Sequence, residues 1–395
     1  MGDTEKEVVS CGACSSYNRE EVEPAVRKAV DAVGGITSFI TPGSRVLLKP
    51  NLLQGLPPER CVTTHPEVVR AVSLICGDLG CQVIIADSPG GGIRYTPANL
   101  RRLYAAAGYD AVARDTGAEL SYDTGHRNVS HPVGRMVKSF PVIAPALDAD
   151  HIIVVSKAKT HLWTLYTGGV KNLFGVLPGL EKPLHHARFQ DPDHFAAMLL
   201  DLNDLLRPSL QVMDAVMVME GDGPSSGTPR PLGAILAGRS ATALDQVACR
   251  MMGIPSAEVP TIRAARERGL PGSSPDQVSL VGDPPDALQE LRVRLPSTYR
   301  GPGRGMQRSM LLSLLHRLGG VYAPYPSFQP DRCQHCGRCA LICPAGALTL
   351  HDGVPEIRRE ICIRCYCCHE ICPAGSIVIS PGPVRRLIAR ISGLS

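Results

Sequence analysis

The chain has 395 residues, of which 44% are hydrophobic and 20% are charged, so it is long enough for two domains with separate cores. Its formal net charge is only +4, which gives no reason to expect nucleic-acid binding. No stretch approaches the roughly 18 consecutive apolar residues of a transmembrane helix, and no apolar signal-peptide core follows the charged start. We therefore expect a cytoplasmic protein without a transmembrane segment.

Strand and helix patterns alternate over most of the chain. Strands are predicted at 45–49, 82–87, 151–155, 210–218 and 234–237. Helices are predicted at 20–33, from the start signal at 63–67 to 79, and at 97–107, 194–206 and 241–252. This alternation is typical of an α/β domain with a parallel or mostly parallel sheet. We assign residues 1–305 to that domain.

Polar or charged residues follow four of the predicted strands. They form the segments 49–51, 87–92, 156–161 and 219–224, and a fifth polar segment, 167–175, contains a pair of glycines. Ligands of parallel α/β sheets bind beyond the carboxyl ends of the strands. The sequence therefore predicts a ligand cleft at this edge of the sheet.

Lysines in these segments suit an anionic ligand. Candidate catalytic residues are Lys171, His161, Lys159 and Lys49, and Lys157 is a further cation in the same segments. If these lysines converge, their mutual repulsion favours a bound anion. Reduction of an organic substrate also needs protons, so His161 is a candidate proton donor, as are His65, His185 and His194.

Other residues of the cleft would contact the ligand through carboxylates, amides and exposed backbone. This candidate binding set is Asp87, Ser88, Gly90, Gly169, Asn172, Glu220 and Asp222. The carboxylates suit a divalent cation, and the glycines allow close approach of backbone N–H groups. The plainer alternative is that the lysines are solvated and the glycines form turns. Walker and dinucleotide motifs are absent, and a flavin has no motif to support it.

A basic region separates this domain from the C-terminal cysteines. Between 291 and 330 there is no Asp or Glu, but there are six arginines. The segment 306–318 is predicted to be an amphipathic helix that covers a domain junction, and we assign 306–327 as helix and linker. A solvated linker, a docking site for an acidic redox partner and a membrane-surface helix are the alternatives. Residues 381–395 form a basic tail.

Eight of the 15 cysteines form two copies of one motif. The copies are Cys333-x-x-Cys336-x-x-Cys339-x-x-x-Cys343-Pro344 and Cys362-x-x-Cys365-x-x-Cys368-x-x-x-Cys372-Pro373. In this motif three cysteines hold one [4Fe-4S] cluster and the fourth reaches the other cluster. The predicted ligand sets are Cys333, Cys336, Cys339 and Cys372 for cluster 1, and Cys362, Cys365, Cys368 and Cys343 for cluster 2.

Other uses of these cysteines fit less well. Structural zinc sites do not need a third cysteine at the same spacing, and disulfide frameworks belong to short secreted chains. Residues 328–380 therefore resemble a bacterial-type ferredoxin with two clusters. Cys367 is left over, either as a small buried residue or as an alternate ligand. Cys11 and Cys14 lack the helix that a redox pair requires.

Nearly the whole chain resembles the DUF362 family, a domain of unknown function that often precedes a ferredoxin with two clusters. The resemblance runs through residues 49–51, 64–67, 87–90, 159–161, 169–175, 220–224, 243–245 and 362–368. It implies an α/β domain followed by a small α+β cluster domain. It implies no particular reaction.

Our leading hypothesis is an iron-sulfur oxidoreductase whose two clusters exchange electrons with an anionic small molecule in the α/β domain. The alternative is a non-catalytic electron carrier whose α/β domain docks a partner enzyme. A third hypothesis is a regulator with oxygen- or iron-sensitive clusters. A redox partner protein is expected in the first two.

Overall fold

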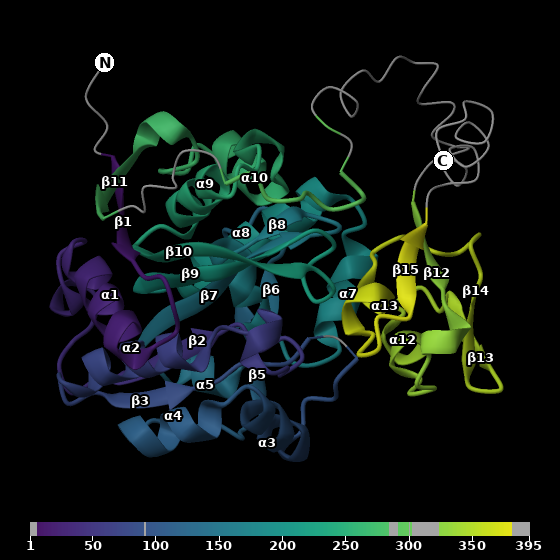
Figure 1. The fold of residues 1–395 in the computed structure, drawn as a ribbon, viewed down its shortest axis with the longest axis horizontal. Helices are drawn as coiled ribbons and strands as arrows, with labels where there is room; N and C mark the ends of the chain where they lie inside the picture. The colour runs from purple at the N-terminus through teal and green to yellow at the C-terminus, as the bar shows by residue number, and fades with distance from the viewer. Residues whose placement is uncertain (1–5, 91, 284–290, 300, 302–323, 381–395) are drawn as a thin grey trace.

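The computed structural model describes residues 6–90, 92–283, 291–299, 301 and 324–380. A large mixed sheet with helices on both faces is followed by a small domain with short antiparallel strand pairs (Figure 1). The predicted fold class, an α/β domain followed by a small α+β cluster domain, is confirmed. The predicted helix at 306–318 and the tail at 381–395 lie outside the described residues.

The large sheet has nine strands within the described residues. Their order is β11-β1-β10-β9-β7-β2-β3-β4, with β8 paired to the end of β7. The strands are β1 (Glu7–Ala13), β2 (Arg45–Pro50), β3 (Gln82–Ile85), β4 (Glu119–Leu120), β7 (His151–His161), β8 (Leu165–Thr167), β9 (Leu210–Glu220), β10 (Thr228–Gly238) and β11 (Val278–Gly282). The run from β9 to β4 is parallel, whereas β10 is antiparallel to both β9 and β1.

Helices cover both faces of this sheet (Figure 1). Helices α1 (Arg19–Asp31), α2 (Pro66–Gly77), α3 (Pro97–Ala106) and α4 (Tyr109–Thr116) share one apolar core with the sheet. Helices α8 (Pro192–Leu206), α9 (Ala241–Met251) and α10 (Pro260–Glu267) pack on the other face. The remaining elements of this domain are α5 (Ala144–Leu147), α6 (Gly169–Asn172), α7 (Glu181–Arg188), the hairpin of β5 (His126–Ser130) and β6 (Ser139–Ile143), and 3₁₀ turns at Ile36–Ser38, Pro58–Arg60, Leu173–Val176, Ser256–Glu258 and Pro275–Gln277.

Two strands differ from the sequence-based prediction. Strand β7 continues beyond residue 155 to His161, so Lys157 and Lys159 lie within the buried part of the strand and not in a loop after it. Strand β1 was not predicted, although it lies between β10 and β11 and buries Cys11 completely. Burial raises the pKa of Cys11, and also that of Cys14, to about 12. These two thiols are therefore core residues in the structure.

The small domain is built from two similar halves. Strand β12 (Tyr325–Phe328) pairs with β15 (Ile377–Ser380), and β13 (Leu348–His351) pairs with β14 (Val354–Ile357). Two short helices, α12 (Arg338–Ile342) and α13 (Cys367–Ile371), carry cysteines of the two motifs, and a 3₁₀ turn lies at Pro330–Arg332. We call residues 325–380 the cluster domain. Figure 1 shows it beside the large domain, with α13 on the side facing α7.

The two domains share an apolar core. Ile342 and Ile371 of the cluster domain belong to the same buried cluster as Leu52 and Ile93 of the α/β domain. Gly92 lies in the contact, because a Cβ atom there would be 3.0 Å from Ile371 and 3.2 Å from Ile342. Packing this close resists added volume, so the domains are expected to hold one fixed arrangement.

A pair of glycine substitutions tests this contact. Gly92 and Gly80 both have a left-handed backbone, with φ of +82° and +68°, but a Cβ at Gly80 would meet nothing within 4 Å. Both Gly→Ala changes should cost about 1 kcal/mol through backbone strain. Gly92→Ala should cost about 1 kcal/mol more through crowding of Ile371 and Ile342. Urea unfolding of the two variants measures the difference, and equal losses would contradict the packed interface.

A second prediction concerns pH and the start of α2. The Nδ1 atom of His65 accepts the backbone N–H of Glu67, and burial lowers the His65 pKa from 6.5 to about 4. Between these values the unfolded state binds the extra proton and the folded state does not, so stability should fall as pH drops from 6.5 to 4.

The effect should be roughly 2 kcal/mol, because His65 keeps some solvent exposure. His65→Asn retains a capping acceptor but does not titrate, so its unfolding free energy should fall less over this pH window. Urea unfolding at several pH values checks this expectation. Identical pH profiles for the two proteins would show that His65 is not responsible.

Candidate functional site

Lys49 and Asp87, predicted from the ends of neighbouring strands, form a buried ion pair. The Lys49 Nζ and Asp87 Oδ1 atoms are 2.8 Å apart, and both side chains are almost fully buried. Asp87 Oδ2 also accepts the backbone N–H of Leu52 at 2.8 Å. Lys49 Nζ donates to the carbonyl of Pro50 and to Asn172 Oδ1, at 2.8 and 3.3 Å. The partners of both charged groups therefore lie within the protein.

Lys159 is buried against neutral partners. Its Nζ donates to Asn51 Oδ1 at 2.8 Å and to the carbonyl of Val62 at 2.7 Å. Asn51 and Asn172 are themselves hydrogen-bonded, so the two asparagines connect Lys159 to Lys49. Burial, with the nearby charge of Lys171, lowers the pKa of Lys159 well below its usual value. The structure thus brings together Lys49, Lys159 and Asn172.

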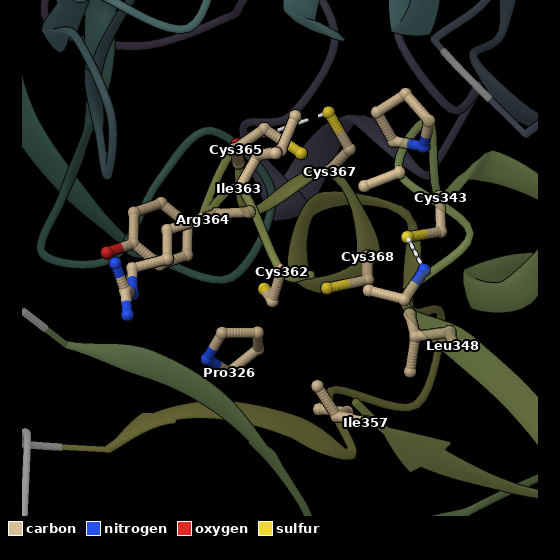
Figure 2. Close-up of a pocket in the computed structure, with 14 residues that line it drawn as sticks. Pro326, Cys343, Leu348, Ile357, Cys362, Ile363, Arg364, Cys365, Cys367 and Cys368 are labelled. Atoms are coloured by element: carbon tan, nitrogen blue, oxygen red, sulfur yellow. Dashed lines mark hydrogen bonds between the residues drawn. The ribbon is translucent and has the colours of Figure 1, made fainter. Parts of the chain in front are cut away.

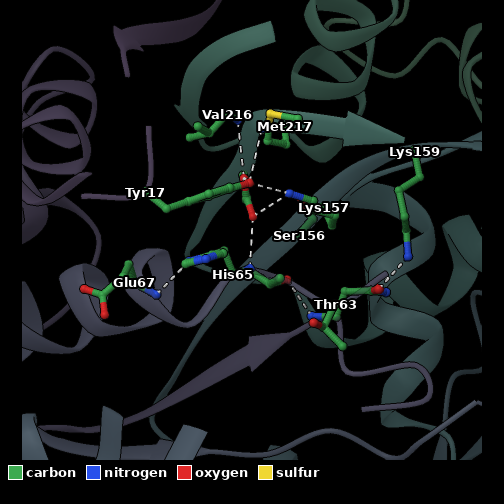
Figure 3. Close-up of polar contacts among 12 residues, drawn as sticks. Tyr17, Thr63, His65, Glu67, Ser156, Lys157, Lys159, Val216 and Met217 are labelled. Atoms are coloured by element: carbon green, nitrogen blue, oxygen red, sulfur yellow. Dashed lines mark hydrogen bonds and ion pairs between the residues drawn. The ribbon is translucent and has the colours of Figure 1, made fainter. Parts of the chain in front are cut away.

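Lys157 belongs to a separate network that the sequence did not reveal (Figure 3). Its Nζ lies 2.8 Å from Asp214 Oδ2 and 2.7 Å from the hydroxyl of Tyr17. The Tyr17 hydroxyl donates to Asp214 Oδ1, and the Tyr17 ring stacks on His65 with centroids 3.6 Å apart. Tyr17 and Asp214 are far from Lys157 in sequence and belong to no recognisable motif, so only the fold identifies them.

Lys171 differs from these lysines. It lies on α6, and its ammonium makes no hydrogen bond or ion pair with any residue that the structure describes. The acidic groups that act on it are Glu370 and Cys367 of the cluster domain, and burial lowers its pKa. The start of α6 is held by Asp245, whose oxygens accept the N–H groups of Gly169 at 2.6 Å and Val170 at 3.1 Å. The Gly169 amide is therefore already occupied.

His161 ends β7 and faces the cluster domain. Its Nδ1 accepts the N–H groups of Trp163 and Thr164, at 3.1 and 3.3 Å, so the hydrogen of the neutral ring is on Nε2. That Nε2 atom lies 3.2 Å from Glu370 Oε1, although the two are not aligned for a hydrogen bond. Burial lowers the pKa of His161 far below its usual value and raises that of Glu370.

The remaining predicted histidines lie elsewhere. His185 donates from Nδ1 to the carbonyl of Glu181, and its neighbour His186 stacks on Phe195 with ring centroids 4.6 Å apart. His194 is exposed at the start of α8. Burial and the nearby charge of Lys171 lower the pKa of His186 well below its usual value. Of these three, His186 is thus the one close to the Lys171 charge.

Ser88 and Gly90 connect the strand ends to the segment before α7. Ser88 Oγ accepts from Gly179 N and from Lys182 Nζ, at 2.8 and 2.7 Å. Burial lowers the pKa of Lys182, a residue that the sequence did not single out, to about 7. Gly90 packs against Leu53, to whose carbonyl its amide donates at 2.5 Å. These glycine and serine groups contact protein in the structure.

Glu220 and Asp222 are not brought to the lysines. Glu220 Oε2 accepts the backbone N–H of Arg294 at 3.0 Å, and Asp222 Oδ1 accepts that of Ser297 at 2.7 Å. Both carboxylates therefore hold the chain after residue 291. Among the described residues, no three His, Cys, Asp or Glu side chains are placed to bind a single metal ion. The structure thus adds no support for a divalent cation.

The two cysteine motifs fold into similar loops. In each, the residue before the second cysteine and the residue after it have a left-handed backbone: His335 and Gly337, and Arg364 and Tyr366, with φ of 52°, 68°, 55° and 60°. These turns curl the loops around two cavities. One cavity is lined by Cys333, Cys336, Cys339 and Cys372. The other is lined by Cys343, Cys362, Cys365, Cys367 and Cys368 (Figure 2).

Each cavity therefore has four cysteines that match one predicted ligand set. Sulfur atoms around a space, and not around a point, suit a cluster better than a single ion. Cys367 is a fifth cysteine in the second cavity, and it is also part of the apolar core shared with the α/β domain. Because Cys367 is the first residue of α13 and packs in that shared core, it lies between the two domains.

Glu370 joins the two domains through its backbone as well as its side chain. Its carbonyl oxygen accepts from Ser225 Oγ at 2.6 Å and from Gln54 Nε2. No sequence pattern selects Glu370, because the cysteine motif accounts for the residues around it. A charged residue between the third and fourth cysteines of the second motif was the one available signal. We call Glu370, His161 and Lys171 the interdomain polar site.

Comparisons with known proteins agree with this architecture. Residues 46–250 match the family model described as Domain of unknown function (DUF362), and residues 325–348 match a 4Fe-4S binding domain. The Thylakoid-associated protein sll1697 of Synechocystis sp. is 32% identical over 305 residues, which cover 74% of this chain and 92% of that protein.

Similarities to solved structures are weak. The lactate racemase apoprotein of Thermoanaerobacterium thermosaccharolyticum aligns with a TM-score of 0.42 and 14% identity, over 65% of this chain and 58% of that one. A Thermotoga maritima protein gives a TM-score of 0.30 and 13% identity, over 54% and 53% of the two chains. In the described part of the chain, no helix is both long and apolar enough to span a membrane. By the family match and the Synechocystis relative, the chain belongs to the DUF362 family, and it is an iron-sulfur protein with a C-terminal 4Fe-4S binding domain.

Proposed function

We propose that this protein is an oxidoreductase in which two [4Fe-4S] clusters exchange electrons with a small anionic molecule held by the α/β domain. Cys333, Cys336, Cys339 and Cys372 would hold the first cluster, and Cys362, Cys365, Cys368 and Cys343 the second. Support comes from the two cavities that these sets line. When bound, each cluster supplies one-electron transfer.

The observation that carries the proposal is the contact between Glu370 and His161. Glu370 lies on the same short helix as Cys368, and its carboxylate is 3.2 Å from the end of β7. The shared apolar core of Ile342 and Ile371 fixes this approach. A carrier domain on a flexible tether would need no such contact, whereas electron exchange with a bound molecule benefits from a fixed short separation.

The residues of the interdomain polar site have complementary roles in this proposal. Lys171 supplies a positive charge that forms no direct ion pair with a described residue, although Glu370 lies near enough to act on it, and this charge favours an anionic ligand. His161 holds a hydrogen on Nε2, the atom that faces Glu370, and is the proposed proton donor. Lys49 and Lys159, both fully buried, are proposed as positioning residues that act through Asn172 and Asn51.

An electron carrier that docks a partner enzyme is the second candidate. Three large apolar side chains are exposed on the cluster domain: Leu341 at 51%, Leu350 at 43% and Ile361 at 39%. Such side chains on a small domain suit contact with another protein. A redox partner at this surface is compatible with the first proposal, because electrons must enter or leave the clusters.

Neighbouring cysteines provide a test of the ligand sets. Protein purified without oxygen should contain about eight iron and eight sulfide per chain. Cys368→Ser should lower this to about four of each, because it removes a ligand of one cluster. Cys367→Ser is the matched control and should keep the full content. Metal and sulfide analysis gives the answer, and a loss of half the iron on changing Cys367 would overturn the assignment.

Lys171 provides a test of the coupling between the domains. A cation near a cluster stabilises its reduced, more negative form. Lys171→Ala should therefore lower the reduction potential of one cluster, on the order of tens of millivolts, and leave the other nearly unchanged. A redox titration followed by electron paramagnetic resonance measures both. Lys138→Ala, an exposed lysine elsewhere in the α/β domain, should change neither potential.

The same variants separate the two candidate functions. The clusters are reduced, excess reductant is removed, and small carboxylates and phosphate esters are added one at a time. The enzyme proposal expects at least one of these anions to reoxidise the wild-type clusters, and Lys171→Ala to slow that step at least about tenfold. Equal rates in Lys171→Ala and wild type, with clusters intact, would favour the carrier.

A further inference from the structure

A groove suited to ligand binding lies between the two domains, next to Cys372. It has a volume of about 390 Å³, a size typical of small-molecule sites. Arg60, Gln54 and Ser225 contribute to it from the α/β domain, and Arg332 and His369 from the cluster domain. None of these residues belongs to the interdomain polar site.

The walls of the groove are fixed by hydrogen bonds between the domains. Gln54 Nε2 and Ser225 Oγ both donate to the carbonyl oxygen of Glu370, the latter at 2.6 Å. Two residues that line the groove thereby hold the end of α13 in place. The groove lies where the two domains meet. A preformed site of this kind loses little entropy when a ligand binds.

The charge around the groove is unbalanced. Arg60 and Arg332 are exposed, and neither guanidinium has an ion pair or hydrogen bond with a residue in the described part of the chain. The carboxylate that lines the groove, Asp222, is already engaged by Ser297, at 2.7 Å from its backbone N–H and 3.1 Å from its hydroxyl. Guanidinium groups bind carboxylates and phosphates through paired hydrogen bonds. The groove therefore favours an oxyanion.

The groove is also lined by the neutral polar residues Gln54, Ser225 and Ser226. Amide and hydroxyl groups can form hydrogen bonds with the uncharged part of a ligand. An organic anion that also carries a hydroxyl group would match this combination of arginines and neutral polar groups.

The groove shares a wall with the first cysteine cavity. Cys372, Pro373 and Ala374 line both the groove and the cavity formed with Cys333, Cys336 and Cys339. A molecule in the groove would thus be separated from that cavity by the Cys372–Ala374 segment alone. The interdomain polar site, in contrast, adjoins α13 and the second cysteine cavity. The two candidate ligand sites are next to different clusters.

We propose that this groove is a second binding site, specific for a small organic oxyanion that Arg60 and Arg332 hold by its carboxylate or phosphate group. It goes beyond the proposed function, because it adds a ligand site beside the first cluster. The binding itself does not depend on any redox activity. Arg60 and Arg332 contact the ligand, while Gln54 and Ser225 position the wall.

Calorimetric titration of the full-length protein with both clusters tests the proposal, with succinate and inorganic phosphate as separate probes. At least one probe should bind, and Arg60→Ala or Arg332→Ala should each weaken binding about tenfold, the loss of one charge-assisted contact. Arg135→Ala, an exposed arginine elsewhere in the α/β domain, should leave the affinity unchanged. The better-bound probe identifies the ligand as a carboxylate or a phosphate.

Any of three results would overturn the groove proposal. The first is that neither probe binds the wild-type protein at millimolar concentration. The second is that binding survives in the Arg60→Ala and Arg332→Ala double variant with full iron content, and the third is that binding is lost in Lys171→Ala. Because Lys171→Ala should leave titration at the groove unchanged, failure of the groove and failure of the proposed electron transfer give different patterns.

Discussion

The structure depends on how helix α13 of the cluster domain is seated against the α/β domain. The carbonyl of its Glu370 accepts from Ser225 and Gln54, and the carboxylate of Glu370 lies 3.2 Å from His161. Ile371 adds apolar contact beside Gly92, where no side chain would fit without displacement. Because this helix also carries Cys368, its seating fixes the second cysteine cavity relative to the strand ends of the sheet.

The buried lysines impose a second constraint. An unpaired buried charge is costly, so each lysine under the strand ends needs a partner. Lys49 is paired with Asp87, and Lys157 with Asp214, at 2.8 Å in both cases. Lys159 has only neutral acceptors, which agrees with its strongly lowered pKa. Charged groups that the sequence analysis predicted as a ligand site therefore serve in large part to hold the strand ends together. Among the lysines of these segments, Lys171 is left as the one that can bind an anion.

The features of the fold and of the site that could be predicted from sequence are those whose interacting residues lie close together in the chain. The cysteine motif is local, so its spacing alone gave two ligand sets that match the linings of two cavities. The α/β pattern was also predictable, because hydrophobic periodicity is local. Strand β1 was missed because its short apolar run was interpreted through Cys11 and Cys14.

The partners of the site were not predictable, because they are distant in sequence. Asp214 meets Lys157 from a different strand, and Glu370 meets His161 across more than half the chain. The burial of Lys157 and Lys159 could not be predicted either. Both follow a hydrophobic run, and nothing local shows that the strand continues through them. The groove beside Cys372 has no sequence signature, since both domains build it.

The proposed function requires two clusters, one of them beside the interdomain polar site. The most direct measurement is a crystal structure of the anaerobically prepared protein, with iron located by its anomalous scattering. The account predicts two separate iron clusters, one among Cys343, Cys362, Cys365 and Cys368, with Glu370 of the adjoining α13 facing His161. A single metal ion in either cavity, or a cluster domain detached from the α/β domain, would contradict it.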